Sequence, residues 1–438
     1  MSSSDLIPPR VRRMERVSAP RLSPAHGPLS GLRVLFTGTV IAGPFIATLL
    51  ADYGAEVIHV ERPGQGDTFR GLGPFYREEG KVLSAPFAND SRNKLSVTLD
   101  LRIDRSPEAK EVFLGLIKQS DIWVENLVWI EKRYGITEEL VFEANPRIVI
   151  VRVSGYGNAR FGGDPDRCDR AAYDLIGQAY AGWPNVVGTE DMPPTRVGLW
   201  ACDYITSMMG TIGALAAYVE AQRSGIGQVV DVAQYEAVAR IMESYFVAYL
   251  NAGIERKREG NKARSFQPYG IFRARDGYVA LGAFGPGVYE RFLEAFCAAT
   301  GIPKEEFPYE RCAATPEAVS SPDGRKLDEA LTRFVSERTC QELEDLFNSY
   351  SVPCSRITTP KDAAQDPHWI SRELFVKAFD GVLEREIFYF GVVPKFSRTP
   401  GRVWRGTPKV GQDTEAVLKE ILGYSEEEIE SLRAKGVI

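Results

Sequence analysis

The chain has 438 residues, of which 44% are hydrophobic and 26% are charged, and it carries a net charge of −6. This composition is typical of a globular protein with room for two domains, and the acidic balance argues against nucleic acid as a partner. No apolar run reaches the roughly 20 residues of a bilayer-spanning helix, so no membrane partner is expected. The six cysteines form no CxxC pair, which predicts reduced thiols, a cytoplasmic protein and no metal site.

Residues 1–28 predict a flexible basic tail. No apolar segment follows the basic residues, so a secretory signal is not expected. The alternatives for this segment are an arm that wraps a second subunit and a transit peptide. Its arginines are Arg10, Arg12, Arg13, Arg16 and Arg21.

Strands and helices then alternate along the chain. Apolar, β-branched runs predict strands at residues 32–37, 56–60, 94–99, 121–125 and 147–153. Helical patterns lie at residues 45–53 and 108–118. The alternation predicts an α/β fold with a doubly wound, Rossmann-like parallel sheet. The first turn lacks GxGxxG, so a dinucleotide-dependent oxidoreductase is a distant alternative.

A second, smaller α+β domain is expected at residues 265–365. It follows a long apolar helix at 203–223, a helix at 235–250 and a charged, glycine-bearing linker or mobile loop at 253–264. It begins with a hairpin at Asp276-Gly277, a favoured two-residue turn. The large domain is expected to comprise residues 29–252 and 390–438, with a return linker at 366–389. Near the C-terminus, Ser425 and Glu428 predict the capping box of a last helix.

Asp174 is the candidate nucleophile. It follows a charged loop and leads into the apolar run of residues 175–179. A free aspartate is ionised at neutral pH and attacks activated acyl groups such as thioesters, although it is a weak nucleophile. The expected donors to the oxyanion are backbone N–H groups near Gly43 or in the loop at 253–266. The alternative interpretation is that Asp174 only caps a helix.

Several ordered blocks carry a resemblance to a known family. They include SRNKLSVTLDLR, SGYG and AAYDLIGQAYAG, and they lie at residues 31–67, 91–102, 154–157, 171–182 and 394–414. Together they resemble the family III CoA-transferases, which include formyl-CoA and carnitine CoA-transferases, over residues 29–438. The last block is most similar to the carnitine and 2-hydroxyacyl branch.

This resemblance implies an enzyme that moves CoA from an acyl-CoA donor to a free carboxylic acid. Asp174 matches the family's nucleophile and would form an aspartyl anhydride and then an aspartyl-CoA thioester. Arg62, Lys94, Arg133 and Tyr156 match positions that contact CoA, although each could also be an ordinary structural or surface residue. Coenzyme A is then a substrate, and no permanently bound cofactor is expected. The resemblance also implies a homodimer of interlocked rings, with a pair of different subunits as the alternative.

Two departures bear on the substrate. Ile41 stands where formyl-CoA transferases carry a glutamine, and Ser154 stands where the family often has a lysine. The run of glycines in the active-site loop of formyl-CoA transferases is also absent. The expected acceptor is therefore a carnitine-like, 2-hydroxy or aryl-substituted organic acid.

The strongest rival is the 2-methylacyl-CoA racemase branch of the same superfamily. A racemase needs acid and base groups on both faces of its substrate, and that branch has a histidine before the aspartate, where this chain has Tyr173. The chain has three histidines, His26, His59 and His368. The second rival, a non-catalytic CoA-binding subunit, is disfavoured because Asp174 is present.

Overall fold

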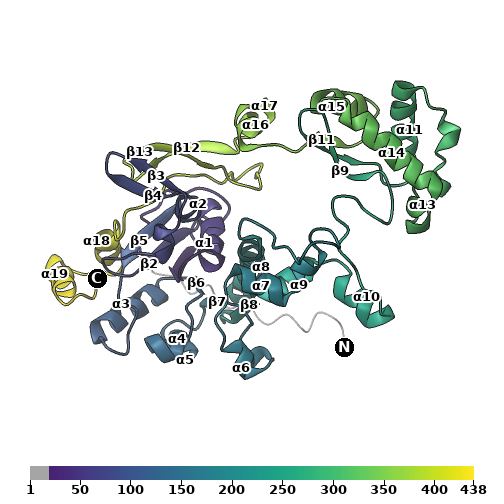
Figure 1. The fold of residues 1–438 in the computed structure, drawn as a ribbon. Helices are drawn as coiled ribbons and strands as arrows, with labels where there is room; N and C mark the ends of the chain where they lie inside the picture. Colours follow the sequence, from purple (N-terminus) through teal and green to yellow (C-terminus); the bar gives the residue numbers. More distant parts are fainter. Residues whose placement is uncertain (1–18) are drawn as a thin grey trace, which may run out of the picture. The chain divides into compact units, whose positions relative to one another are not determined.

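A computed structural model describes residues 19–438 of the chain. Arg10, Arg12, Arg13 and Arg16 of the expected basic tail lie outside the described residues. The chain divides into two compact units, each described by itself below (Figure 1). The large unit holds the chain up to Ala181, with Gly198–Glu243 and His368–Ile438, and the small unit holds Gly182–Val197 and Ser244–Pro367.

The large unit is built on a six-stranded sheet in the order β5-β2-β1-β6-β7-β8. All neighbouring strands are parallel, which confirms the predicted parallel α/β sheet. The strands are β1 (Arg33–Thr37), β2 (Glu56–Glu61), β5 (Lys94–Thr98), β6 (Ile122–Glu125), β7 (Val149–Ser154) and β8 (Val229–Ala233). The strand order reverses between β1 and β6, and sheets of this type bind ligands at the carboxyl ends of the strands at such a point.

Helices cover both faces of the sheet (Figure 1). On one face, Phe36 and Val124 pack with α1 (Ala42–Asp52) and α8 (Ala201–Ser224). On the other face, Leu35 and Trp123 pack with helices that share the remaining core. These helices are α3 (Pro107–Lys118), α5 (Glu138–Ala144), the π-helical turn Val417–Ile421 and α19 (Glu426–Ala434). Burial on both faces explains why the strands read as continuous apolar runs.

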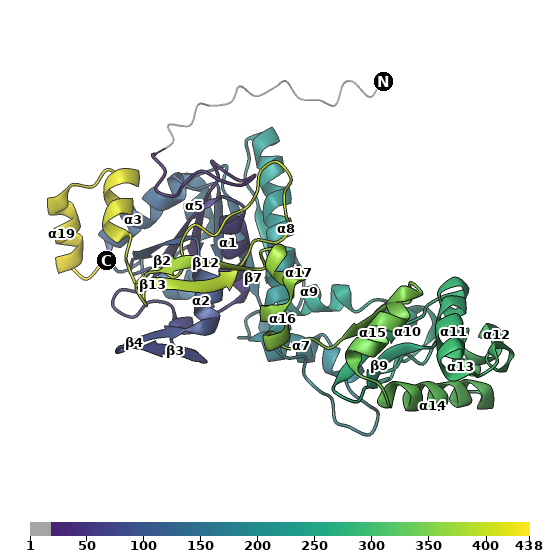
Figure 2. The same cartoon turned by 90° about the horizontal axis from the view of Figure 1, so that it is seen from above.

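The C-terminal segment closes the β5 edge of the sheet. The Ser96 N–H donates to Asp413 Oδ2 (2.8 Å), and the Asp413 N–H donates to the Ser96 carbonyl (2.9 Å). The Thr98 N–H donates to Thr414 Oγ1 (2.9 Å). The chain then ends in α19, beside α3 (Figure 2), where the predicted capping box of Ser425 and Glu428 is present. Backbone N–H and carbonyl groups of β5 that would otherwise lack a hydrogen-bond partner are thus paired within the chain.

Two hairpins complete the large unit. They are β3 (Phe75–Glu78) with β4 (Lys81–Ser84), and β12 (Phe375–Asp380) with β13 (Arg385–Phe390). Leu83 of the first hairpin and Ile387 of the second belong to one small apolar cluster. The segment at 366–389, expected as a return linker, therefore contains β12 and most of β13, because its alternating apolar residues are buried against the first hairpin.

The small unit has an antiparallel sheet in the order β11-β10-β9. Its strands are β9 (Tyr269–Arg273), β10 (Tyr278–Gly282) and β11 (Cys354–Arg356). The hairpin predicted at Asp276-Gly277 is confirmed, since β9 and β10 pair across it. Phe292, Phe296 and Phe347 lie in the core between the sheet and its helices. The main helices are α11 (Pro286–Thr300), α14 (Pro322–Ser336) and α15 (Cys340–Ser349).

The boundary between the units differs from the expected one. The helix predicted at 235–250 is broken into α9 (Gln234–Ile241) and α10 (Tyr245–Ala252). Glu243 lies between them with φ of 51°, a left-handed conformation that ends a helix. The small unit therefore begins at Ser244, and it also includes Gly182–Val197.

The remaining helices are short. They are α2 (Ala85–Ser91), α4 (Ile130–Tyr134), α6 (Pro165–Cys168), α7 (Asp174–Tyr180), α12 (Tyr309–Cys312), α13 (Pro316–Ser320), α16 (Pro360–Gln365), α17 (Pro367–Ser371) and α18 (Thr414–Ala416). Across residues 19–438, no helix combines the length and apolar character needed to cross a bilayer.

Candidate active site

Asp174 is the first residue of α7, and its side chain is 2% exposed. Its Oδ1 accepts hydrogen bonds from the backbone N–H groups of Cys202 (2.8 Å) and Asp203 (3.3 Å) at the start of α8. Its Oδ2 accepts one from Gln178 Nε2 (2.7 Å). The N-cap position of α7 belongs to Tyr173, so Asp174 does not cap its own helix as the alternative interpretation had it. It satisfies instead the first N–H groups of α8, which a helix leaves without partners.

Two glycines permit the close approach of the segments around Asp174. A Cβ on Gly177 would lie 2.6 Å from Cys202 Sγ, so α7 sits directly against the start of α8. A Cβ on Gly155 would lie 2.2 Å from the Cβ of Ala172, so the turn after β7 lies against the residues before Asp174. Any side chain at either position would push the Asp174 segment away from its partners.

A second carboxyl group lies next to Asp174. The side chain of Asp203 is 5% exposed, and its Oδ1 accepts a hydrogen bond from Gln234 Nε2 (2.5 Å). Burial, with the nearby charge of Asp174, raises the pKa of Asp203 to about 7. Burial also raises the pKa of the neighbouring Cys202 thiol to about 12, so this thiol is not a nucleophile at neutral pH.

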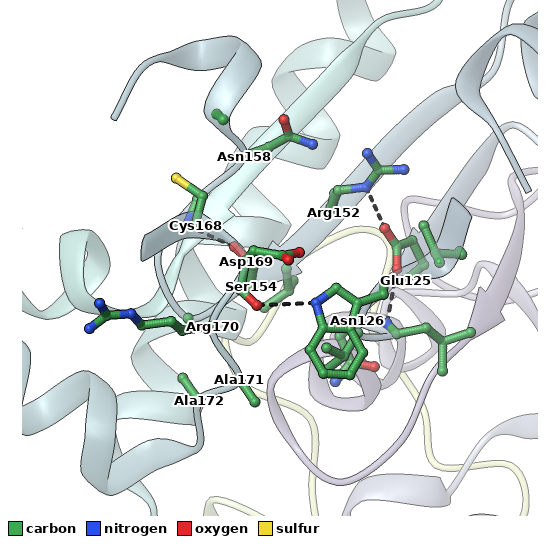
Figure 3. A pocket seen from close by; sticks show the side chains of 18 of the residues that line it. Glu125, Asn126, Arg152, Ser154, Asn158, Cys168, Asp169, Arg170, Ala171 and Ala172 are labelled. Atoms are coloured by element: carbon green, nitrogen blue, oxygen red, sulfur yellow. Dashed lines mark hydrogen bonds and ion pairs between the residues drawn. The ribbon is translucent and has the colours of Figure 1, made fainter. Parts of the chain in front are cut away.

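A cavity of about 490 Å³, here called the inner cavity, opens at the carboxyl ends of β6 and β7. One wall carries Glu125 and Arg152, joined by a hydrogen bond of 2.5 Å from Arg152 Nε to Glu125 Oε1 (Figure 3). The loop that leads to Asp174 lines another side, and there Asp169 accepts hydrogen bonds from Trp129 Nε1 (3.1 Å) and Lys132 Nζ (3.0 Å). The lining includes Ala172 and Gln234, which belong to the segments that surround Asp174.

A cavity of about 620 Å³, here called the outer cavity, opens at the carboxyl ends of β1 and β2. Its lining contains Arg62, directly after β2, and Arg133, on α4. Leu127 and Lys132 line both the inner and the outer cavity. The two cavities therefore adjoin at the switch point of the sheet, and the exposed guanidinium groups of Arg62 and Arg133 line the outer one. Guanidinium groups in such a place suit an anionic ligand.

Known proteins resemble this chain along most of its length. The model of CoA-transferase family III matches residues 29–414. The chain belongs to this family. Bile acid CoA-transferase BaiK of Clostridium scindens is 36% identical over 423 residues, covering 94% of this chain and 90% of that protein. Succinyl-CoA–D-citramalate CoA-transferase of Chloroflexus aurantiacus is 36% identical over 414 residues, covering 94% and 98%. A CAIB/BAIF family protein from Brucella suis shares the fold with a TM-score of 0.77 and 25% identity, over 90% of this chain and all of that one.

The protein is thus a family III CoA-transferase, and CoA thioesters are among its substrates. The structure brings two of the four expected CoA contacts together, since Arg62 and Arg133 line the outer cavity. Tyr156 is half-buried in the turn after β7, with its ring 5.1 Å from that of Tyr180 and 6.4 Å from that of Tyr235.

Lys94 lies apart from the other candidates in this CoA-transferase. Its side chain is completely buried, and Nζ donates to the carbonyls of Pro44 (2.8 Å) and Asp90 (2.5 Å). Burial lowers the pKa of this ammonium group to about 7. The linings of the two cavities do not include it. Its hydrogen bonds hold the first turn of α1 against α2, which is a structural role.

Sequence reasoning did not find the residues that hold Asp174. The groups that bind its carboxylate come from the start of α8 and from Gln178; the oxyanion donors expected near Gly43 or in the loop at 253–266 stay a prediction. Gln178 follows Asp174 by one helical turn, and this spacing could have indicated a contact. The N–H groups of Cys202 and Asp203 leave no such signal, because every residue has a backbone and the two segments are far apart in sequence.

Proposed function

We propose that this CoA-transferase moves CoA from an acyl-CoA donor to a free carboxylic acid through covalent intermediates on Asp174. The observation that carries the proposal is the position of the Asp174 carboxylate. It is fixed by two backbone N–H groups and by Gln178, next to the segments that line the inner cavity.

The first step is attack of an Asp174 carboxylate oxygen on the thioester carbonyl. The carbon–sulfur bond breaks, CoA leaves as its thiolate, and a mixed anhydride forms. The thiolate then adds to Cγ of Asp174, the anhydride bond breaks, and the first acid leaves as its carboxylate. The resulting aspartyl-CoA thioester reacts with the second acid by the same steps in reverse.

The start of α8 supplies the oxyanion donors for the step at Cγ. When the thiolate adds to Cγ, negative charge grows on the oxygen that remains double-bonded in the anhydride. If this oxygen is Oδ1, the N–H groups of Cys202 and Asp203 already point at it, at 2.8 and 3.3 Å. Preorganised donors of this kind are worth about 3–4 kcal/mol each in other acyl-transfer enzymes.

The two cavities provide the path for CoA. In this proposal the nucleotide end lies in the outer cavity, with its phosphates near Arg62 and Arg133. The pantetheine arm passes Leu127 and Lys132, which line both cavities, and the thioester reaches Asp174 through the inner cavity. Tyr156 lies in the turn after β7, which borders the inner cavity. We do not assign Lys94 to CoA because both of its known partners lie in the protein interior.

The acceptor in this proposal is a carnitine-like, 2-hydroxy or aryl-substituted organic acid. One relative is named for D-citramalate, which is a 2-hydroxy acid, and another for bile acids, which carry a bulky ring system. Both names support an acceptor larger than formate.

We also expect an interlocked homodimer that acts in the cytoplasm. Support comes from α8, where Met208, Ile212 and Val219 are exposed and share one helix face. The molar mass in solution, measured by light scattering, tests the dimer.

Intact-mass analysis tests the covalent route. The protein is incubated with a panel of acyl-CoAs, and mass spectra are recorded before and after hydroxylamine, which cleaves anhydrides and thioesters. We expect an acyl or CoA adduct on the wild type and on Asp345→Ala, an exposed aspartate on α15 that lies outside both cavity linings and serves as the matched control. We expect none on Asp174→Ala. An adduct that persists in Asp174→Ala would refute the assignment, and α-hydrogen exchange in deuterated water without any adduct would favour the racemase.

A further inference from the structure

The proposed nucleophile has a buried acidic neighbour that the steps above do not use. Asp203 is on α8, its own N–H donates to Asp174 Oδ1 (3.3 Å), and its side chain accepts from Gln234 (2.5 Å). The Gln234 amide comes from α9 and lines the inner cavity. Asp203 is thus coupled to Asp174 through its backbone and through space, and it is tied to the cavity wall through its side chain.

The surroundings of Asp203 are poor in positive charge. From α7 it faces the carboxylate of Asp174, and from α2 it feels the charge of Asp90, whose carbonyl binds the buried Lys94. From α9 it meets the neutral Gln234 amide. Burial makes the largest contribution to its raised pKa, the charges of Asp174 and Asp90 add to it, and the Gln234 hydrogen bond opposes it. Two carboxylates this close in a desolvated place resist being ionised together.

Resting on the proposed function, we propose that Asp203 is a positioning residue that keeps a proton while Asp174 is ionised and releases it when Asp174 is acylated. Acylation converts Asp174 from an anion into a neutral anhydride or thioester. The charge of Asp174, the second cause of the raised pKa of Asp203, then disappears, so this pKa falls and part of the proton population passes to solvent. Ionisation of Asp203 thus replaces part of the negative charge that Asp174 loses.

Proton release gives this inference a pH dependence with a defined sign. The net half-reaction, acyl-CoA plus the Asp174 carboxylate giving aspartyl-CoA plus a free carboxylate, neither takes up nor releases a proton. Any proton that appears therefore comes from the protein. Because acylation releases it from a group that titrates near pH 7, the equilibrium fraction of adduct rises as the pH rises toward neutrality. The pH dependence of the adduct fraction should disappear in a variant whose residue 203 cannot ionise.

An infrared titration of the free enzyme tests the coupling without any turnover. Protonated carboxyl groups have a distinct C=O stretch, and we expect a band in the wild type that titrates near pH 7 and is missing in Asp203→Asn. Asp90, whose pKa burial raises to about 6, gives a separate band that both proteins share. The asparagine keeps the acceptor oxygen for Gln234, so the fold should be retained. In Asp174→Asn the Asp203 band should titrate at a pH lower by about 1 unit or more, since the repelling charge is gone. A band titrating near pH 7 that survives in Asp203→Asn, or an unchanged midpoint in Asp174→Asn, would overturn the inference.

A second experiment measures the proton directly. A pH-indicator dye follows acylation by an acyl-CoA in weak buffer slightly below pH 7, and intact mass gives the amount of adduct. We expect the release of about 0.5 proton per adduct in the wild type if the pKa of Asp203 falls by about 1 unit, none in Asp203→Asn, and recovery in Asp203→Glu, which restores the ionisable group. Equal release by the wild type and Asp203→Asn would contradict the inference. If no adduct forms on the wild type, the proposed function fails, and the infrared titration still decides whether the two carboxyl groups are coupled.

Discussion

Replacing Gly177 with alanine tests the close packing of α7 against the start of α8. The new Cβ would lie 2.6 Å from Cys202 Sγ and 3.1 Å from the Cβ of Gln234. Ordinary contacts between such atoms lie near about 3.7 Å, so the helices must separate by about 1 Å. Overpacking of this kind costs about 1–3 kcal/mol, which the better helix propensity of alanine offsets by about 1 kcal/mol. We expect a net loss of about 0–2 kcal/mol of stability.

The same shift should affect catalysis more than stability. The Cys202 N–H lies 2.8 Å from Asp174 Oδ1, and lengthening this distance by about 1 Å takes it beyond the range of a hydrogen bond. We expect adduct formation by Gly177→Ala to slow by about 10–100-fold, up to the effect of losing one oxyanion donor. Gly287→Ala is the matched control, since a Cβ on Gly287 in α11 meets no atom within 4 Å.

A double-mutant cycle then identifies the cause. Cys202→Ala removes the sulfur atom that the new methyl group would strike, so the double variant Gly177→Ala/Cys202→Ala should recover part of the lost stability and rate. We expect a favourable coupling of about 1–2 kcal/mol, measured by thermal unfolding and by the rate of adduct formation. If Gly177→Ala reacts as fast as the wild type, or if the two substitutions simply add, the packing of α7 on α8 does not position Asp174 and the reasoning is wrong.

Two further predictions concern the outer cavity and the response to acid. Arg62→Ala and Arg133→Ala should each raise the KM for acyl-CoA about 3–10-fold with little change in kcat. Added salt should raise the wild-type KM more than that of the double variant. An equal effect on KM of Arg372→Ala, an exposed arginine outside the cavity lining, would contradict the assignment. Burial lowers the pKa of His59 to about 3, so the unfolded chain binds more protons than the folded one between about pH 3 and 6.5 and stability falls as the pH drops through this window, by up to about 4 kcal/mol. Urea unfolding of His59→Leu should show a shallower loss over the same range, and a loss equal to that of the wild type would refute the link.

The elements that the sequence predicted well depend on local signals. Continuous β-branched runs placed the strands of the parallel sheet, because strands covered on both faces need apolar residues throughout. The turn at Asp276-Gly277 and the capping box of Ser425 and Glu428 are also local, and both were found. The features that were missed join distant segments. Pairing of β12 with β13, and the break at Glu243, depend on what the chain packs against, which a local pattern does not contain.

The candidate site shows the same difference between local signals and contacts that join distant segments. Asp174 was proposed from its residue type and from the family resemblance of its neighbours in sequence, and its role as nucleophile stays a prediction. Its surroundings could not be predicted, since the N–H groups that hold it follow it by 28 and 29 residues. Lys94 shows the opposite case, because a charged residue in a recognised block suggested a ligand contact, whereas tertiary packing places it in the interior. A motif thus suggests candidate groups, whereas tertiary structure shows what surrounds them.

The closure of the β5 edge has a consequence for how the protein is made. Strand β5 lies at Lys94–Thr98, but the residues that cover it, Asp413 and Thr414, follow Ser96 and Thr98 by 317 and 316 residues. During translation the nascent sheet therefore exposes an open edge while the small unit and the second hairpin are still being added. Open edges pair readily with other chains. Truncation before residue 409 should leave protein that is synthesised normally but recovered in aggregates, and chaperones that shield strand edges should matter most for this protein before Asp413 and Thr414 leave the ribosome.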